Sequence, residues 1–595
     1  MNRKGIIAVI LLVLPLAACS GPDAADFAGQ FLSAFAGGDT AGAAGRTDAG
    51  DSAKPLLDNV RGSLKPAAVT MRVDGSDPAG DATKVRFSAD WDLGQDRHWT
   101  YQGELEMRRD SNNGADTWKV HWTPAVVHPK LGAQQTVGVR DVEASMAPIL
   151  DRDGSPLVAS TKVVSVILDP AKAGDVAAVA AAIAGAVNQF DPSITAQSIT
   201  DGVAKARNQP YTVVSLRDAD YQVVKAAIYQ LPGVRFLAAT RLLPVTKNMA
   251  EQVLPTVRKQ VEGQISGKPG FRVVSLNAAG GEVADLFTKD MVAGTAAHVT
   301  LSTKVQSSAE AAIDSLPQAA ALVAIQPSTG EILAVAQNKP ADAQGAIALT
   351  GRFPPGSTFK TVTAAAGLQG GNVTADTPVP CPGTITIGSR VVPNFNEFDK
   401  GVIPLHSAYA FSCNTSFAKL ASELPPDALA NAAKQFGIGL DYTIPGITTV
   451  TGSVPPATDT TERAEDGFGQ GKVLASPFGL AMMASTVASG TLPKPTLVRG
   501  EETKVDAAPS AVPPAVVDAL RQMMREVVTT NSAQTLGKLP DVRGKTGTAQ
   551  FGDGTHSHGW FAGYMGDLAF AVLVVDAGNS GVAVDASTRF LQGTS

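Results

Sequence analysis

Residues 357–360 read Ser357-Thr358-Phe359-Lys360, a serine followed three positions later by a lysine. The loop Arg352-Phe353-Pro354-Pro355-Gly356 comes directly before them and must end before a helix can begin. An Ala-rich run from Thr358 to Leu368 follows and predicts a helix with Ser357 at its N-terminus. Because residues three apart share a helix face, we expect the lysine amine within reach of the serine hydroxyl.

Two further motifs follow in chain order, Ser412-Cys413-Asn414 and Lys545-Thr546-Gly547-Thr548. Together the three form the series S-x-x-K, S-x-N and K-T-G. Each motif alone is a weak signal, since S-x-x-K occurs again at 416–419 and S-x-N at 111–113 and 275–277. We expect the hydroxyl at 416 to satisfy backbone within a helix. We assign 111–113 to a polar turn and 275–277 to the end of a Val-rich strand.

The first motif suits nucleophilic catalysis. A serine hydroxyl is a poor nucleophile until a base removes its proton. A partly desolvated Lys360 is expected to be neutral near pH 7 and to act as the base for Ser357. The helix N-terminus would also favour negative charge on the serine oxygen.

The other two motifs suit substrate binding and proton transfer. We expect Lys545 and the hydroxyls of Thr546 and Thr548 to hold a substrate carboxylate by charge-assisted hydrogen bonds. Gly547 would let a substrate backbone approach closely and pair as an added strand. From the S-x-N motif, we expect Ser412 to relay a proton to a leaving amine. Asn414 would bond an acyl-side-chain amide and the lysine network.

The ordered motifs resemble those of class B penicillin-binding proteins, the monofunctional transpeptidases of bacterial wall synthesis. Three more stretches share the resemblance: a strand hairpin at 321–334, the Gly469-Gln470-Gly471 loop before Ala475-Ser476-Pro477, and a strand at 558–564. The resemblance covers about 299–595 and implies a serine β-lactamase-like domain, an antiparallel sheet flanked by helices. It also implies an oxyanion hole made by the backbone N–H groups of Ser357 and Thr548.

Upstream stretches at 118–124 and 128–131 resemble the N-terminal extension of the methicillin-resistance type of this family, and 151–154 resembles the start of its pedestal domain. The resemblance implies a multidomain α+β chain. We predict a nuclear-transport-factor-two-like domain over 23–135, a pedestal or dimerisation domain over 137–295 and a transpeptidase domain over 299–595. The residue patterns agree, with helical spacing of Phe27, Phe31, Leu32 and Phe35, strand-like alternation over 85–93 and 99–107, and an Ala-rich helix from Val176 to Val187.

The chain begins with a short basic segment and an apolar run from Gly5 to Ala18, too short for a comfortable membrane span. We therefore predict a signal peptide over 1–18. Leu16-Ala17-Ala18-Cys19 resembles a bacterial lipobox, which implies cleavage before Cys19 and a lipid anchor on the outer face of the cytoplasmic membrane. An uncleaved anchor and a simple secretory leader are the alternatives.

The remaining candidate ligands and partners are few. Cys381 and Cys413 could form a disulfide in an exported protein, or remain as two buried thiols. His556 and His558 lack further ligands at usable spacing, so we predict a structural or rim role and no metal or cofactor. Trp560 is expected in the core. The net charge of −6 and the lack of a basic tract argue against nucleic-acid binding.

Three functions compete. The first is a D,D-transpeptidase that binds peptidoglycan stem peptides ending in D-Ala-D-Ala, forms an acyl-enzyme at Ser357 and is inhibited by β-lactams. The second is a carboxypeptidase or β-lactamase, which needs a base for water such as Glu397. The third is a non-catalytic penicillin sensor or wall scaffold. The family resemblance also implies a glycosyltransferase partner.

Overall fold

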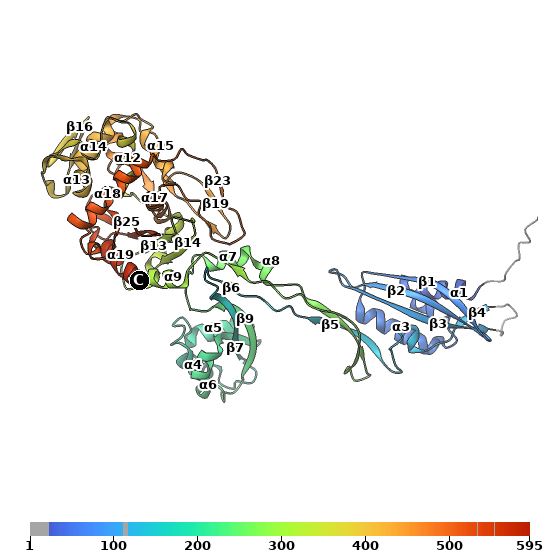
Figure 1. Cartoon of the computed structure of the whole chain (residues 1–595). Helices are drawn as coiled ribbons and strands as arrows, with labels where there is room; N and C mark the ends of the chain where they lie inside the picture. Colours follow the sequence, from blue (N-terminus) through green and yellow to red (C-terminus); the bar gives the residue numbers. More distant parts are fainter. Residues whose placement is uncertain (1–22, 111–116, 532, 553, 595) are drawn as a thin grey trace, which may run out of the picture. The chain divides into compact units, whose positions relative to one another are not determined.

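The computed structural model describes residues 23–110, 117–531, 533–552 and 554–594. The signal peptide, Cys19 and the S-x-N triplet at 111–113 lie outside these ranges. The chain divides into two compact units, one up to Ser145 with Gly267–Ala293, the other Met146–Ser266 with the rest from Gly294 (Figure 1). Within the described ranges, none of the helices combines the length and apolar character that a membrane span needs.

The first unit begins with helices packed on a four-stranded antiparallel sheet of order β1-β2-β3-β4. Alternate residues of β2 and β3 are buried, as the alternation of apolar residues predicted. Phe31, Leu32 and Phe35 of α1 are buried with them, which confirms the amphipathic helix. The elements are α1 (Ala24–Gly37), α2 (Thr40–Ala44), α3 (Gly50–Leu64), β1 (Ala68–Ala79), β2 (Ala82–Asp92), β3 (His98–Asp110), β4 (Thr117–Val120) and η1 (Pro124–Val126).

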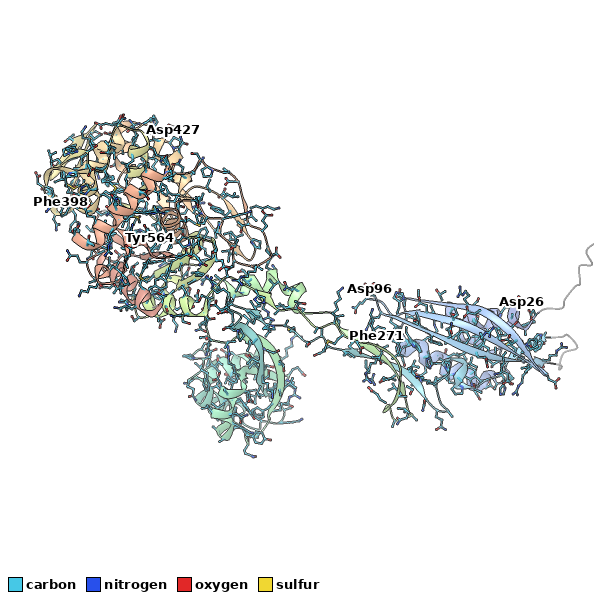
Figure 2. The ribbon with its side chains drawn as sticks, viewed as in Figure 1. Asp26, Asp96, Phe271, Phe398, Asp427 and Tyr564 are labelled. Carbon is cyan, nitrogen blue, oxygen red and sulfur yellow. A yellow bond between two sulfur atoms is a disulfide. The ribbon has the colours of Figure 1, made fainter. Side chains whose placement is uncertain are left out.

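A second sheet of order β11-β10-β5 completes this unit, with β5 at Thr136–Val142, β10 at Gly270–Leu276 and β11 at Glu282–Lys289. Phe271, labelled in Figure 2, lies on β10 and is buried in the same apolar core as α1 and β2. The hairpin from 267 to 293 therefore groups with the N-terminal unit, although it falls within the range predicted for the pedestal. The boundary at 137–295 stays a prediction.

The second unit starts with a sheet of order β12-β6-β7-β8, on which β9 also pairs with β7. The predicted Ala-rich helix is α4, and it begins and ends where expected. It packs with α5 and α6 in a separate apolar cluster. The elements are β6 (Ile149–Leu150), β7 (Pro156–Leu168), α4 (Val176–Val187), α5 (Ala196–Lys205), β8 (Tyr211–Arg217), α6 (Asp218–Ile228), β9 (Val234–Pro244), α7 (Leu254–Gln260), α8 (Glu262–Ile265) and β12 (Ala297–His298).

The rest of the second unit is built on a five-stranded antiparallel sheet of order β14-β13-β26-β25-β24. Its strands come from both ends of this segment: β13 (Ala320–Ile325) and β14 (Ile332–Gln337) from the start, β24 (Arg543–Phe551), β25 (His556–Met565) and β26 (Leu568–Val574) from the end. All six residues of β13 are buried, so both faces of the sheet are covered. Tyr564 in Figure 2 marks β25.

Helices cover this sheet, and two of the three motifs lie at helix ends while the third lies on the edge strand β24. Helices α9 (Thr303–Ile313) and α19 (Gly581–Thr594) pack on each other and on the sheet, and α17 (Pro477–Ser489) packs on β13, β25 and β26. The fold class is confirmed, an antiparallel sheet flanked by helices after an α+β N-terminal domain. The motif-bearing elements are η2 (Gly356–Phe359), α12 (Lys360–Gln369), α13 (Leu405–Ala410), α14 (Asn414–Ser422) and β24.

The remaining elements of this domain are mostly short. The longest of them is the 17-residue helix α18 (Pro514–Thr530), which packs on α13 and β24. The others are α10 (Lys339–Asp342), α11 (Ile347–Thr350), β15 (Pro378–Cys381), β16 (Thr384–Ile387), β17 (Arg390–Pro393), η3 (Phe395–Glu397), β18 (Gly401–Pro404), α15 (Ala428–Gln435), β19 (Tyr442–Ile444), β20 (Ile447–Thr448), β21 (Gly452–Ser453), α16 (Thr460–Asp466), β22 (Leu474–Ala475), β23 (Lys504–Val505) and η4 (Leu536–Lys538).

Candidate active site

Ser357 lies on the 3-10 turn η2, which continues directly into α12. The predicted helix is present, but Ser357 lies one tight turn before its first residue, Lys360. The preceding Gly356 has a positive φ of 53°, and a Cβ there would lie 2.7 Å from the carbonyl oxygen of Thr548. Only glycine fits this close approach. The turn is therefore fixed against the strand that carries the third motif.

Lys360 contacts both Ser357 and the second motif. Its Nζ lies 2.9 Å from Ser357 Oγ, 3.1 Å from Ser412 Oγ and 2.7 Å from the Ser412 carbonyl oxygen. It also donates to Asn414 Oδ1 at 2.7 Å. The side chain is fully buried, and this burial, with the nearby charge of Lys545, holds the pKa of the amine well below its usual range.

Ser412 lies between two lysines. Its Oγ accepts from Lys360 Nζ at 3.1 Å and from Lys545 Nζ at 3.0 Å. The residue has a φ of 63°, in the left-handed region that is costly for a non-glycine residue. This strained backbone, between α13 and α14, presents both the carbonyl and the hydroxyl oxygen of Ser412 to Lys360.

Lys545 lies on β24 and is fully buried. Besides Ser412, its Nζ donates to the carbonyl oxygen of Thr546 at 3.1 Å. Burial lowers the pKa of Lys545 to about 7. Among the described residues no carboxylate pairs with this amine or with Lys360. The cluster therefore holds two weakly basic amines around one hydroxyl, an arrangement that can pass a proton.

Two aromatic rings support the lysines, and no sequence motif predicted them. The Nζ of Lys545 lies 5.5 Å from the ring centroid of Tyr409, and the Nζ of Lys360 lies 5.7 Å from that of Phe417. The Tyr409 hydroxyl is 2.8 Å from Thr361 Oγ1 on α12. These rings flank the S-x-N triplet on α13 and α14. A ring face attracts a cation, so both rings favour an ammonium above them.

The K-T-G strand, β24, is an edge of the sheet and packs on η2, the turn that carries Ser357. A Cβ at Gly547 would lie 2.8 Å from the carbonyl oxygen of Pro355 and 2.9 Å from Thr358 Cγ2. The glycine is thus required by contact with the residues around Ser357, a reason that differs from the expected approach of a substrate backbone. Trp560 on β25 is buried and donates to the Pro354 carbonyl oxygen at 3.0 Å, which confirms its place in the core.

Asn414 opens α14 and has both amide atoms engaged. Its Oδ1 accepts from Lys360, and its Nδ2 donates to the Pro393 carbonyl oxygen at 2.9 Å. Since an amide nitrogen carries two hydrogens, one remains for another acceptor. The neighbouring Cys413 is joined to Cys381 by a disulfide, with Cα atoms 5.9 Å apart. This bond ties β15 to the S-x-N turn.

The competing copies of the motifs lie elsewhere. Ser416 is buried within α14 and donates to the Pro380 carbonyl oxygen at 2.7 Å, while Lys419 pairs with Glu423 on the same helix. The Ser416 hydroxyl therefore satisfies backbone, although the carbonyl is distant in sequence. Ser275 lies on β10 and donates to backbone. Neither serine has a buried lysine as its hydrogen-bond partner.

The two histidines after the K-T-G strand differ in exposure. His556 is exposed and lies 3.0 Å from Asp576. His558 is buried, and burial lowers the pKa of its ring to about 4. Across the described ranges, no cluster of three or more His, Cys, Asp or Glu side chains could hold a metal ion. Glu397, the candidate base for water, is exposed on η3.

The site and fold match known families. Residues 320–590 match the family model described as the penicillin binding protein transpeptidase domain. Residues 23–135 match the model of an NTF2-like N-terminal transpeptidase domain. Both matches lie in segments for which the sequence patterns predicted these folds.

Relatives of known name are similar over long stretches. Peptidoglycan D,D-transpeptidase PbpA of Mycobacterium tuberculosis is 30% identical over 353 residues, which cover 50% of this chain and 70% of that protein. Penicillin-binding protein 3 of Bacillus subtilis is 24% identical over 83% of both chains. A structure of a complex between penicillin-binding protein PBP2 and MreC from Helicobacter pylori shares the fold, with a TM-score of 0.57, 18% identity, and coverage of 77% of this chain and 99% of that one.

Proposed function

The chain belongs to the class B penicillin-binding proteins, the peptidoglycan D,D-transpeptidases, and we propose that Ser357 is the nucleophile of its acyl transfer. The observation that carries this assignment is the 2.9 Å contact between Lys360 Nζ and Ser357 Oγ inside a buried cluster. A lowered pKa favours the neutral amine, which is the form of Lys360 that can accept a proton.

Acylation follows from the geometry of the cluster. Neutral Lys360 takes the proton of Ser357, and Oγ attacks the carbonyl of the penultimate D-Ala. The backbone N–H groups of Ser357 and Thr548 stabilise the oxyanion. The C–N bond breaks, and the proton passes through the Ser412 hydroxyl, 3.1 Å from Lys360 Nζ, to the departing D-Ala amine.

Transfer runs the same path in reverse. The amine of a neighbouring stem peptide attacks the acyl-enzyme, its proton returns to Ser357 through the same cluster, and a cross-link forms. Lys545 in its charged form, with the hydroxyls of Thr546 and Thr548, holds the terminal carboxylate of the donor. Asn414 presents its remaining N–H to the amide carbonyl on the acyl side. Gly547 lets β24 pack against η2, the turn that carries the proposed nucleophile Ser357.

The exposed position of Glu397 supports transfer over hydrolysis. Fast hydrolysis of an acyl-enzyme needs a base beside the ester. Among the described residues, no carboxylate hydrogen bonds to Ser357, Lys360 or Ser412. The acyl group would therefore wait for an amine acceptor.

The proposal extends to the location and the partners of the enzyme. The lipobox at residues 16–19 supports cleavage before Cys19 and a lipid anchor that holds the enzyme outside the cytoplasmic membrane, where its substrate is. The family supports a glycosyltransferase partner that supplies glycan strands. Mass spectrometry of the mature protein from membranes tests the anchor, and an unmodified Cys19 would contradict it.

Fluorescent penicillin tests the proposed nucleophile. The purified protein from Ser20 onward should give a covalent label that persists for hours, and Ser357→Ala should give none. Ser416→Ala, in the second S-x-x-K motif, is the matched control and should label like the wild type. A label that forms and disappears within minutes would indicate a hydrolase.

A further inference from the structure

The loop Gly469-Gln470-Gly471 follows α16 in the chain and contacts Gly356, the residue before Ser357. The Gly469 carbonyl accepts from Gly356 N–H at 3.0 Å, and Gln470 N–H donates to the Glu465 carbonyl at 3.1 Å. A Cβ at Gly469 would lie 2.0 Å from the Gly356 carbonyl oxygen, so the loop is pressed against the residue before Ser357. These contacts fix the backbone of Gln470 beside the active site.

The side chain of Gln470 reaches β24. With its amide oriented so that both atoms are satisfied, Oε1 accepts from Gln550 N–H at 2.9 Å and Nε2 donates to the Gln550 carbonyl at 3.2 Å. This pair of bonds is the one that a residue of a neighbouring antiparallel strand would make. Since β24 is the edge of its sheet, Gln470 takes the place of an added strand at Gln550.

Gln550 lies two residues after Thr548 on β24. Residues two apart on a strand present their N–H and C=O groups to the same side, so Thr548 and Gln550 face the same neighbour. Consider a donor peptide whose scissile carbonyl accepts from the Thr548 N–H. The residue of the donor that comes before its acyl residue would then lie beside Gln550. That place is already filled by an amide.

We propose that Gln470 is a specificity-determining residue that ends the pairing of the acyl donor with β24 after its acyl residue. The inference rests on the proposed function of Ser357. The donor class is a peptide ending in D-Ala-D-Ala, or a β-lactam that mimics it. Backbone upstream of the acyl residue leaves the strand, so the enzyme recognises the end of the donor and ignores the chemistry of the rest.

Two penicillins that differ only in backbone length test this limit. One carries an acetyl group on its 6-amino nitrogen, and the other carries acetyl-glycyl-glycyl, which adds two backbone amides. The wild type should acylate with both at rates within about twofold. In Gln470→Ala the freed Gln550 pair should raise the ratio of the extended to the short penicillin about tenfold, equal to about 1.4 kcal/mol, the size of two net backbone hydrogen bonds.

Gln435→Ala is the matched control, because Gln435 lies on α15 and pairs with Gln369 and Ser510. It should leave the ratio at the wild-type value. An unchanged ratio in Gln470→Ala, with both rates lowered equally, would show that Gln470 only braces the strand and would overturn the inference. Failure of both penicillins to label the wild type at Ser357 would instead overturn the proposed function, and the inference with it.

Discussion

The N-terminal unit and the catalytic domain both bury titratable side chains, but they use them differently. In the N-terminal unit, the ring of His128 packs against Trp99 and Tyr101, with ring centroids 5.5 and 4.7 Å away. The Tyr101 hydroxyl donates to the carbonyl of Val127, and His128 Nδ1 accepts from the backbone of Lys130. The hydrogen bonds that the Tyr101 hydroxyl donates and that His128 Nδ1 accepts thus both have backbone partners, and burial lowers the pKa of His128 to about 4.

In the catalytic domain, burial also lowers the pKa values of Lys360 and Lys545, yet their partners are side chains that can exchange protons. Both amines meet at the hydroxyl of Ser412, and one of them also contacts Ser357. A buried polar group whose hydrogen-bond partner is the backbone stabilises the fold but has no side chain with which to exchange a proton. The comparison shows that a shifted pKa does not mark a site unless the shifted groups converge on a nucleophile.

The strongest test of this difference removes the base. Lys360→Met should lower the rate of acylation by penicillin about a thousandfold, within the range that general-base catalysis provides. The melting temperature should not fall greatly, because a buried amine is replaced by an apolar side chain of similar length. Stopped-flow measurement of acylation checks the rate. Lys419→Met, in the second S-x-x-K motif, should react like the wild type, and equal losses in both variants would contradict the assignment.

The complementary test damages the N-terminal core. Trp91 is fully buried there and packs on Phe35 and Trp99. Trp91→Ala should reduce the free energy of unfolding of this unit by about 3–5 kcal/mol, the usual cost of truncating a buried aromatic side chain. Penicillin acylation should stay at the wild-type rate, because the two units have separate apolar cores. Chemical denaturation measures the first quantity, and a parallel loss of acylation would show that the regions depend on each other.

A smaller effect separates the roles of the two lysines. Because the pKa of Lys545 is about 7, its charge is lost as pH rises, and the hold on the carboxylate weakens. Acylation of the wild type should fall about fivefold between pH 7 and pH 8, as the fraction of ammonium falls. Lys545→Arg keeps its charge and should not show this fall. Lys419→Arg should retain it, and an identical alkaline fall in Lys545→Arg would contradict the role given to Lys545.

The smallest effect concerns His128. Its pKa of about 4 lies below the ordinary 6.5, so the unfolded chain binds more protons between these values. Stability of the N-terminal unit should therefore decrease as pH falls from about 6.5 to 4, and His128→Phe should reduce that decrease. His98 is exposed, and its hydrogen bond with Asp90 raises its pKa. His98→Phe should therefore not reduce the loss of stability at low pH. Melting curves against pH measure both, and a His128 ring that titrates near 6.5 by NMR would contradict this account.

Much of the fold follows from patterns that report burial directly. The alternation on β2 and β3, the α4 helix and the core position of Trp560 were all predicted, because strand and helix periods leave a clear trace in the sequence. The sequence did not predict that the β10–β11 hairpin belongs to the N-terminal unit. Val-rich strands indicate burial but do not say against which core, and Phe271 and Val273 pack with the N-terminal unit.

The site was predictable only in part. The three motifs named the polar groups of the cluster, since their order and spacing are distinctive. The rings of Tyr409 and Phe417, the strained φ of Ser412 and the contact of Gly547 with the nucleophile turn depend on how distant segments pack. The contact between the Gln470 amide and Gln550 of β24 was also not predictable, because nothing in the Gly-Gln-Gly sequence indicates which strand its side chain meets.

Mass spectrometry after reaction with benzylpenicillin tests the central claim most directly, that the buried lysine cluster activates Ser357. We expect one penicilloyl group per chain, located by peptide mapping on the peptide that contains Ser357, and still present after hours. An adduct on Ser412 or Ser416, or an unmodified chain with hydrolysed penicillin in solution, would contradict it.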